Sequence, residues 1–312
     1  MTEDLKKRIA RFDELASRTD CARPSPLILK LKIQPDLFDS LRCAVALYMS
    51  RCLPSRKVLT AESDIMAEFS KRSAELKNKN NNGCLLPKRE LTLEYNMIHR
   101  AYGDIMRSFN FTGLIASFYA LTTIRHKDEW TKSKWANSEN SAKTYSTENP
   151  HSDAWLGESP HSMNTITPIF GDTKDNNCAY YAPPDNFSDR WLKILKFLDG
   201  AEYFSYYDPI PVFESSEPGF TYLSDISVIH KSNLKENAGP RVSIDHLSFA
   251  NIGGGELYHP THPRLSYDRF CHIGREELIT FKSSINDPIT LENADPHKSW
   301  GISEISRKTV LS

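Results

Sequence analysis

The stretch GFTYLSDISVIHK, Gly219–Lys231, shows the sequence pattern that is typical of the C-terminal half of this 312-residue chain. It is a short run rich in apolar, β-branched and aromatic residues, which is typical of a β strand, and it carries His230 near its end. Comparable runs cut by turn residues recur past Pro150, namely MNTITPIFGD, CAYYAPPDN, AEYFSYYDP, PRVSIDHLSF and ELITFKSS. Runs of this length and spacing predict an all-β sandwich or barrel.

The N-terminal third has a helical periodicity instead. Apolar residues recur three and four positions apart from Leu37 to about Lys71 and from Lys88 to about Ser108. We expect the first of these helices to be interrupted at Pro54. A further helix at the start of the chain is predicted by an apolar stripe made of Leu5, Ile9, Phe12 and Leu15.

Two later segments carry more specific predictions. The segment Gly113–His126 predicts the end of a helix followed by a strand that ends at Arg125. The segment FSDRWLKILKFLDG predicts one helix within the β region, with Ser188 as N-cap and Gly200 as the stop.

We therefore expect an α+β fold, in which an N-terminal helical layer lies against a C-terminal β core. No linker rich in Pro, Gly and Ser separates the two parts, so residues 1–312 are predicted to form a single domain. Its parts are a mainly helical layer (1–126), a polar loop (127–149), a β core (150–290) and a C-terminal tail (291–312).

Composition and charge exclude several classes of partner. The chain has 39 basic and 40 acidic residues, so no strong net field favours nucleic acid or an anionic membrane. Its longest apolar stretch, Cys43–Met49, is far shorter than the roughly 20 residues of a membrane span, and no export signal begins the chain. The six cysteines form no C-x-x-C pair, which favours reduced thiols and a cytoplasmic protein. We expect a small-molecule substrate, and the oligomeric state is not readable.

Three residues form a candidate metal site. If the stretch PHSDAW is extended, His151 and Asp153 face the same side. The third candidate ligand is His230. Two histidines and one carboxylate leave coordination positions open, an arrangement suited to Fe(II). The alternatives are a polar turn at His151-x-Asp153 and a strand-end histidine bonded to a backbone carbonyl.

The run PRVSIDHLSF supplies a candidate carboxylate clamp. Arg241 follows His230 by 11 residues, which fits one turn and a return along the neighbouring strand. Arg241, Ser243 and Asp245 alternate onto one face of that strand, and His246 takes the other. A guanidinium and a hydroxyl on one face suit a carboxylate. The alternative is an internal salt bridge of Arg241 with Asp225 or Asp245.

The set His151-x-Asp153, His230 and Arg241-x-Ser243 resembles the Fe(II)/2-oxoglutarate-dependent oxygenase superfamily, whose fold is a double-stranded β-helix of jelly-roll or cupin type. Within it, the texture PHSDAWLGES…TPIFGD…IHKSN…RVSID is similar to a branch found in carbohydrate and aminoglycoside biosynthesis clusters, including the streptomycin pathway. The resemblance covers roughly Glu148–Phe249 and leaves out the helical third.

This resemblance implies specific roles. His151, Asp153 and His230 would hold Fe(II), and Arg241 with Ser243 would hold the distal carboxylate of 2-oxoglutarate. The implied reaction consumes O2, releases succinate and CO2, and usually hydroxylates a C–H bond of the substrate. We expect a small polar metabolite, with a sugar or sugar-derived intermediate as the first candidate. Two other hypotheses stay open: a non-catalytic β-helix binding or scaffold protein, and a cupin-type metalloenzyme without 2-oxoglutarate.

Other polar and aromatic residues carry weaker hypotheses. His161 and Glu158 are interpreted as turn or surface residues, whereas Asn176 and Arg125 are possible substrate or cosubstrate contacts. Trp155 either lines the pocket or fills the core. The segment HPTHPRLSYDRFCH, with His259, His262 and His272, predicts a structured surface loop rather than a second metal site.

Overall fold

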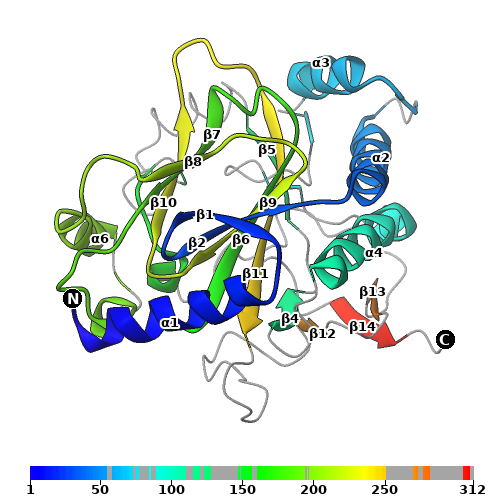
Figure 1. The fold of residues 1–312 in the computed structure, drawn as a ribbon. Coiled ribbons are helices and arrows are strands. Elements are labelled where there is room, and N and C mark those ends of the chain that lie inside the picture. Colours follow the sequence, from blue (N-terminus) through cyan, green and yellow to red (C-terminus); the bar gives the residue numbers. More distant parts are fainter. Residues whose placement is uncertain are drawn as a thin grey trace.

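Helices and antiparallel strands are mixed in the computed structural model of the chain (Figure 1). The structure describes residues 1–54, 58–72, 75–76, 84–85, 89–109, 115–119, 123–127, 147, 149–156, 160–193, 195, 197–250, 270–272, 277–281 and 305–309. Within these ranges, no helix is both long and apolar enough to cross a membrane. The predicted C-terminal tail and most of the predicted polar loop lie outside the described residues.

The helices lie in three places around the strands. Figure 1 shows α2, α3 and α4 grouped together, α1 along the opposite edge of the molecule, and α6 near the N-terminus. Their bounds are α1 (Glu3–Ser17), α2 (Pro35–Cys52), α3 (Glu62–Arg72), α4 (Thr92–Ser108) and α6 (Phe197–Phe204).

Helix boundaries follow local chemistry. The side chain of Thr2 accepts a hydrogen bond from the backbone N–H of Leu5 and so caps α1. Pro35 begins α2, where a missing N–H has no cost, and α2 ends two residues before Pro54, because proline disfavours helical backbone just before it. The predicted interruption at Pro54 is confirmed.

A large antiparallel sheet forms the centre of the described structure. Its path runs β1-β2-β9-β6-β11-β4-β12, with β5 also beside β11 and β3 beside β5. The bounds are β1 (Cys21–Ser25), β2 (Ile28–Lys32), β3 (Cys84–Leu85), β4 (Ile115–Tyr119), β5 (Thr123–Lys127), β6 (Ser162–Gly171), β9 (Phe220–Asp225), β11 (Arg241–Ala250) and β12 (Phe270–His272). The N-terminal third thus contributes strands as well as helices.

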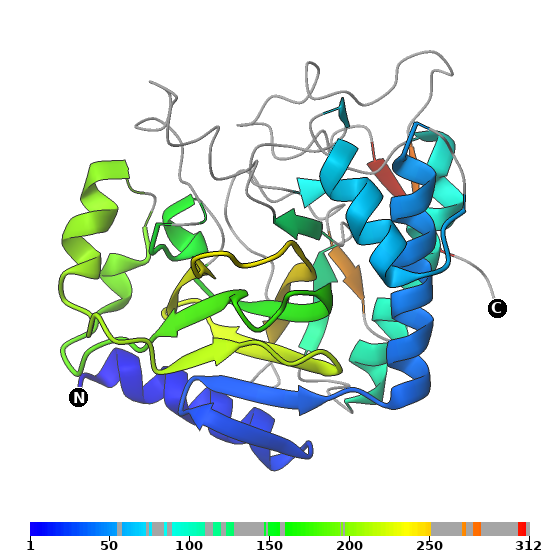
Figure 2. The same ribbon diagram turned by 90° about the horizontal axis from the view of Figure 1, so that it is seen from above.

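A smaller antiparallel sheet contains β10 (Ile229–Leu234), β7 (Asn176–Tyr181) and β8 (Phe213–Ser215), in that order. A separate pair is formed by β13 (Glu277–Phe281) and β14 (Ile305–Thr309). Figure 2 shows the strands in the centre, with α2 and α4 on one side and α6 on the opposite side.

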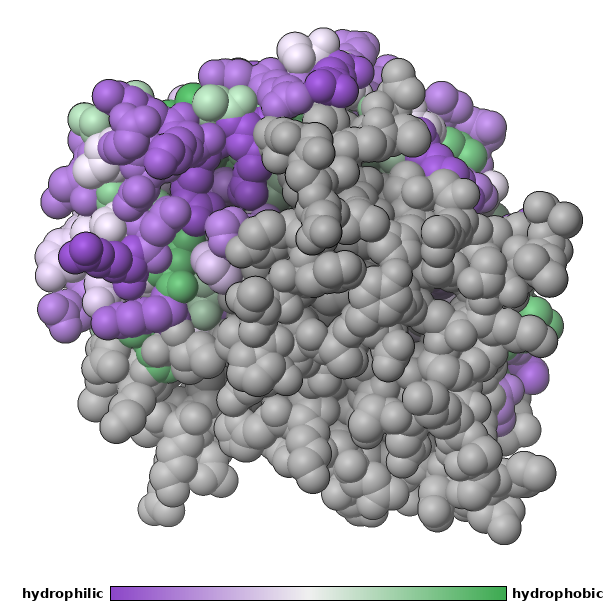
Figure 3. All heavy atoms as spheres, turned by 90° about the horizontal axis from the view of Figure 1, so that it is seen from below, coloured by the Kyte–Doolittle hydropathy of each residue, from purple (hydrophilic) through white to green (hydrophobic). Residues whose placement is uncertain are grey.

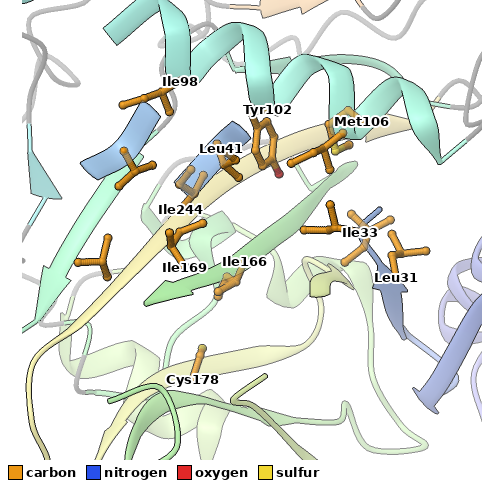
Figure 4. Close-up of a cluster of buried hydrophobic side chains, with 14 of the residues drawn as sticks. Leu31, Ile33, Leu41, Ile98, Tyr102, Met106, Ile166, Ile169, Cys178 and Ile244 are labelled. Carbon is orange, nitrogen blue, oxygen red and sulfur yellow. The ribbon is translucent and has the colours of Figure 1, made fainter. Parts of the chain in front are cut away.

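The buried apolar side chains form two clusters. The larger one includes the space between α2, α4 and the large sheet, where Figure 4 shows Tyr102 of α4 and Ile244 of β11, and it extends to α1 and β7. Cys178 of β7 lies on the other side of β6 in the same view, so the small sheet covers the face that the helices leave open. A second cluster packs between the outer face of the small sheet and α6, and contains Trp155, Ala179, Tyr181, Leu195, Tyr207 and Ile229. On the face shown in Figure 3, the described side chains are mainly hydrophilic.

Two predicted elements differ in the structure. Gly113–His126 contains two strands, β4 and β5, where a helix end and one strand were expected. The predicted helix after Ser188 is split into a 3-10 turn, Asp189–Trp191, and α6. Ser188 does cap the turn, but Gly200 lies inside α6 and does not end it. Trp155 explains the split, because its Nε1 donates to the carbonyl of Trp191 and its own carbonyl accepts from Leu195.

Candidate metal centre

Three side chains with metal-binding chemistry converge beside the small sheet. One ligand atom from each of His151, Asp153 and His230 lies within 4.8 Å of the other two. Oδ1 of Asp153 is 3.7 Å from Nε2 of His151 and 3.9 Å from Nε2 of His230. The two imidazole rings are 4.5 Å apart between centroids. The three residues that the sequence predicted to form one site are therefore neighbours in space.

The backbone explains this convergence. His151 and His230 form an isolated antiparallel bridge, in which each backbone N–H donates to the other residue's carbonyl, at 3.0 Å and 2.9 Å. Asp153 begins a 3-10 helix, Asp153–Leu156, so the tripeptide is not fully extended as the sequence argument assumed. Ser152 points away from the site and donates to the carbonyl of Ile226 at 2.7 Å, which anchors the residue between the two candidate ligands.

Hydrogen bonding fixes which nitrogen of His151 can bind a metal. Nδ1 of His151 lies 2.7 Å from the carbonyl oxygen of Asn149. A carbonyl can only accept, so Nδ1 carries the proton and Nε2 carries the lone pair. Nε2 is also the nitrogen that faces Asp153. This orientation of a ligating histidine by a backbone carbonyl is common at metal sites.

Asn164 of β6 also belongs to the site and was not singled out in the sequence. Its Nδ2 donates to Oδ2 of Asp153 at 2.8 Å and lies 3.2 Å from Nε2 of His230. Its amide lies in a strand of mixed polar and apolar residues, and the sequence does not say which residues the amide meets. The contact also shows that β6 of the large sheet approaches β10 of the small sheet here.

The surroundings of the three candidate ligands are largely closed to solvent. The side chain of His151 is 3% exposed and that of Asp153 is 20% exposed. Tyr180, which is paired with His230 across β7 and β10, is fully buried, and its ring lies 6.4 Å from the ring of His230. Burial raises the pKa of Tyr180 well above its usual value, so this phenol stays neutral beside the site.

Arg241 and Ser243 lie on β11 of the large sheet. The prediction that Arg241 returns along the strand next to His230 is wrong, because β10 belongs to the small sheet. The alternation predicted for β11 is nevertheless present: Val242 and Ile244 lie in the core on the helix side, and Ser243 donates to Oδ1 of Asp245 at 3.2 Å.

The register places Arg241 and Ser243 on the face of the large sheet that turns toward the metal centre. Leu247 is paired with Asn164, and residues directly opposite in a sheet share a face. Ser243 lies four positions from Leu247 along β11, about 13 Å at roughly 3.3 Å per residue. Arg241 is 2% exposed. Asp225, one of the two carboxylates considered as an ion-pair partner of Arg241, binds Arg8 and Arg11.

The remaining sequence candidates lie elsewhere or outside the description. His161 is exposed, as expected for a turn residue. Trp155 fills the second core cluster, and Asn176 donates to the carbonyl of Gly239 at the far end of β7. The described structure does not cover Glu158, His259, His262 or the side chains of Arg125, His246 and His272.

The donor set fits a divalent transition metal. Two imidazole nitrogens and one carboxylate oxygen suit Fe(II) and related ions, and three protein ligands leave positions for other molecules. The tautomer that His151 adopts is the one required for binding through Nε2. The residues present therefore fit the iron that the sequence resemblance implies.

Comparison with protein-family models and with curated proteins found no match. Among solved structures, AviO1 from Streptomyces viridochromogenes Tue57 matches with 14% identity and a TM-score of 0.37, over 84% of this chain and 98% of AviO1. SnoK, a non-haem α-ketoglutarate-dependent carbocyclase from nogalamycin biosynthesis, matches with 9% identity and a TM-score of 0.44, over 86% of this chain and 96% of SnoK. EctD from S. alaskensis, solved with 2-oxoglutarate and 5-hydroxyectoine, matches with 14% identity and a TM-score of 0.41, over 80% of this chain and 76% of EctD. All three TM-scores are below 0.5.

Proposed function

We propose that this chain is an Fe(II)/2-oxoglutarate-dependent oxygenase that hydroxylates a C–H bond of a small polar metabolite. The observation that carries the proposal is the convergence of His151, Asp153 and His230 within 4.8 Å. This ligand set holds Fe(II) while leaving positions for a chelating cosubstrate and for oxygen. The first substrate class to test is a sugar or sugar-derived intermediate, on the strength of the sequence resemblance.

The strand connections support a double-stranded β-helix. From β5 onward the chain passes repeatedly between two sheets: β5, β6, β9 and β11 lie in the large sheet, whereas β7, β8 and β10 lie in the small one, where β7 and β8 are consecutive. The segment that ends at His151 runs beside β10, because the backbone N–H of Ser232 donates to the carbonyl of Thr147. Thr147 and His151 thus lie at the β10 edge of the small sheet. Strands that pass between two sheets in this way fit a jelly roll.

The proposed cosubstrate site lies along β11. A guanidinium offers a planar pair of donors that matches a carboxylate. The hydroxyl of Ser243 donates to Asp245 in this structure, so it would have to turn away from Asp245 to donate to the cosubstrate as well. Both residues lie on the face that Asn164 shares, with Arg241 farther along the strand. In this proposal the distal carboxylate of 2-oxoglutarate binds the guanidinium of Arg241, which reaches from β11 toward the metal centre, and the keto-acid end faces the metal.

When bound, Fe(II) and 2-oxoglutarate supply the oxidising chemistry, in which O2 gives one oxygen atom to succinate and one to the substrate C–H bond, with release of CO2. The chain's own residues position and shield. His151, Asp153 and His230 fix the ligand face, and Arg241 would orient the cosubstrate. Buried side chains beside His230, including Tyr180, limit the access of water.

Anaerobic titration with Fe(II) and 2-oxoglutarate tests the proposal. We expect a visible metal-to-ligand charge-transfer band in the wild-type protein and its loss in His151→Ala. His161→Ala is the matched control, because it removes an exposed imidazole from the same region. The absence of a band in the wild type, or a band that persists in His151→Ala, would contradict the proposal.

A succinate-release assay across a panel of sugars and sugar derivatives then separates an enzyme from a binding protein of the same fold. Turnover that survives Arg241→Ala would favour a cupin-type metalloenzyme that needs no 2-oxoglutarate.

A further inference from the structure

Asn164 contacts two of the three candidate ligands, Asp153 and His230. It lies on β6 in the middle of the large sheet, paired with Leu247 on one side and Ser224 on the other. Its side chain is nearly buried, at 6% exposure of the residue. A buried amide on a central strand is held in one position, since both the backbone pairing and the packing fix it.

The contact with Asp153 divides the two carboxylate oxygens between two tasks. Oδ2 accepts the hydrogen bond from Nδ2 of Asn164 at 2.8 Å. Oδ1 is the oxygen that faces the two histidines, at 3.7 Å and 3.9 Å from their Nε2 atoms. A carboxylate held in this way presents one oxygen to a metal, which leaves more of the coordination sphere open than binding through both oxygens.

The contact with His230 concerns the nitrogen that a metal needs. Nδ2 of Asn164 lies 3.2 Å from Nε2 of His230, and an amide nitrogen can only donate. Nε2 therefore carries the lone pair and Nδ1 carries the proton, which is the tautomer that binds a metal through Nε2. A metal bound there would take the lone pair and displace this hydrogen bond, while the bond to Asp153 can remain.

We propose that Asn164 is a positioning residue of the metal centre, which holds Asp153 to binding through Oδ1 alone and keeps the lone pair of His230 directed into the site until a metal arrives. This inference rests on the proposed metal site. One side-chain amide from the large sheet would thus orient two ligands that come from different segments of the chain.

Titration of the metal-free protein with Co(II), followed by calorimetry and by visible absorption, tests the role without requiring turnover. Asn164→Leu removes both donors at similar volume. We expect its Co(II) affinity to fall about 10- to 100-fold, the usual effect of losing a partner that orients a ligand. We also expect its ligand-field spectrum to change, because Asp153 can then bind through both oxygens.

Thr165→Val is the matched control, since it removes a buried hydroxyl from the next residue of β6. Oγ1 of Thr165 lies 3.2 Å from Oγ of Ser248, away from the three candidate ligands. This variant should keep the wild-type affinity and spectrum. A second measurement follows the side-chain amide resonances of Asn164, assigned in the wild type by triple-resonance NMR, during titration with diamagnetic Zn(II). They should shift at one equivalent.

The outcomes separate the inference from the proposed function. If the wild type binds no Co(II), both fail. If the wild type binds Co(II) and Asn164→Leu binds it with the same affinity and spectrum, only the role of Asn164 is overturned. If Asn164→Leu does not fold, unshifted Asn164 amide resonances in the wild type at saturating Zn(II) would overturn it, and shifted ones would support it.

Discussion

Arg241 is the residue whose charge the proposed cosubstrate site requires. Arg241→Met retains an aliphatic side chain and removes the guanidinium. Because a hydrogen bond to a charged group contributes about 1.5–3 kcal/mol and about 1.4 kcal/mol is tenfold in affinity, we expect 2-oxoglutarate to bind about 10- to 100-fold more weakly. Calorimetric titration of the Co(II)-loaded protein measures this change, and the affinity for Co(II) itself should stay as in the wild type.

Lys235→Met provides the control for a general loss of positive charge. Lys235 follows β10 at the surface, where its side chain is 48% exposed and pairs with Asp175 at 3.3 Å. It lies between His230 and Arg241 in sequence but outside the proposed site. Equal weakening of 2-oxoglutarate binding in both variants would show that Arg241 makes no specific contact.

For single residues, the sequence identifies the candidate ligands better than it identifies the residues that orient them. The spacing of His151, Asp153 and His230 carried enough chemistry to predict their convergence. Asn164 could not be predicted, because its partners lie on other segments and its role depends on how β6 faces β10. The same limit applied to Asp225, which pairing rules alone could match equally well with Arg241.

Among the elements, α1 is tied to the turn that precedes β10. Arg8 donates to Asp225 and Asp189 at 2.8 Å each, and the carboxylate of Asp225 is completely buried. Arg8→Met leaves that carboxylate with fewer cationic partners, and removing one partner of a buried ion pair costs about 3–5 kcal/mol. We expect the free energy of unfolding to fall by an amount near the lower end of this range, because Arg11 still pairs with Asp225. Urea unfolding measures it.

Arg18→Met, at the C-cap of the same helix, is the matched control. Its ion pair with Glu14 is exposed, at 51% and 35% of the two side chains, and such pairs contribute about 0–1 kcal/mol. A similar loss of stability in Arg8→Met and Arg18→Met would contradict the view that the buried cluster fastens α1 to the sheet.

The same cluster predicts a pH dependence. Burial alone would raise the pKa of Asp225, but Arg8, Arg11 and the backbone N–H of Ser227 outweigh it and lower the pKa from 3.8 to about 2. A carboxyl group with a lowered folded-state pKa contributes stability above its unfolded pKa, and this contribution is lost as the pH falls through the folded value. The window is therefore about pH 4 to pH 2, and the contribution is about 2 kcal/mol.

Urea unfolding of the wild type and Asp225→Asn across this window checks the prediction. The stability difference between the two proteins should shrink by about 2 kcal/mol from pH 5 to pH 2, because only the wild type loses an ionised group. A difference that stays constant with pH would mean that folding does not lower the pKa of Asp225.

Element types were predictable where a local signal was strong. The break at Pro54 and the helical spacing of α4 depend on the chain's own backbone and apolar period, so they follow from sequence. The split at Trp191 depends on Trp155, which is 36 residues away. Likewise, the strands β4 and β5 complete the large sheet beside β11, and a local reading of Gly113–His126 contains no information about that partner.

The arrangement of the whole molecule depends on pairings that no single segment encodes. An alternating strand predicts two faces, and this was sufficient to place Arg241 and Ser243 together. It does not say which sheet the strand joins, and β10 and β11, although consecutive, belong to different sheets. The metal centre lies where these two sheets meet, at the contact of Asn164 with His230.

Binding of a metal at this meeting point should stabilise the whole fold. A ligand that binds only the folded state at 100 times its Kd adds about 2.7 kcal/mol to the free energy of unfolding. We expect Co(II) to produce this gain in the wild type and in His161→Ala, measured by urea unfolding at matched free metal. His151→Ala should show little or none, since it lacks one of the three ligand atoms. An equal gain in His151→Ala would mean that the metal binds elsewhere on the chain. A gain found only in proteins with all three ligands would mean that the small sheet and the segment before β6 unfold together with the site.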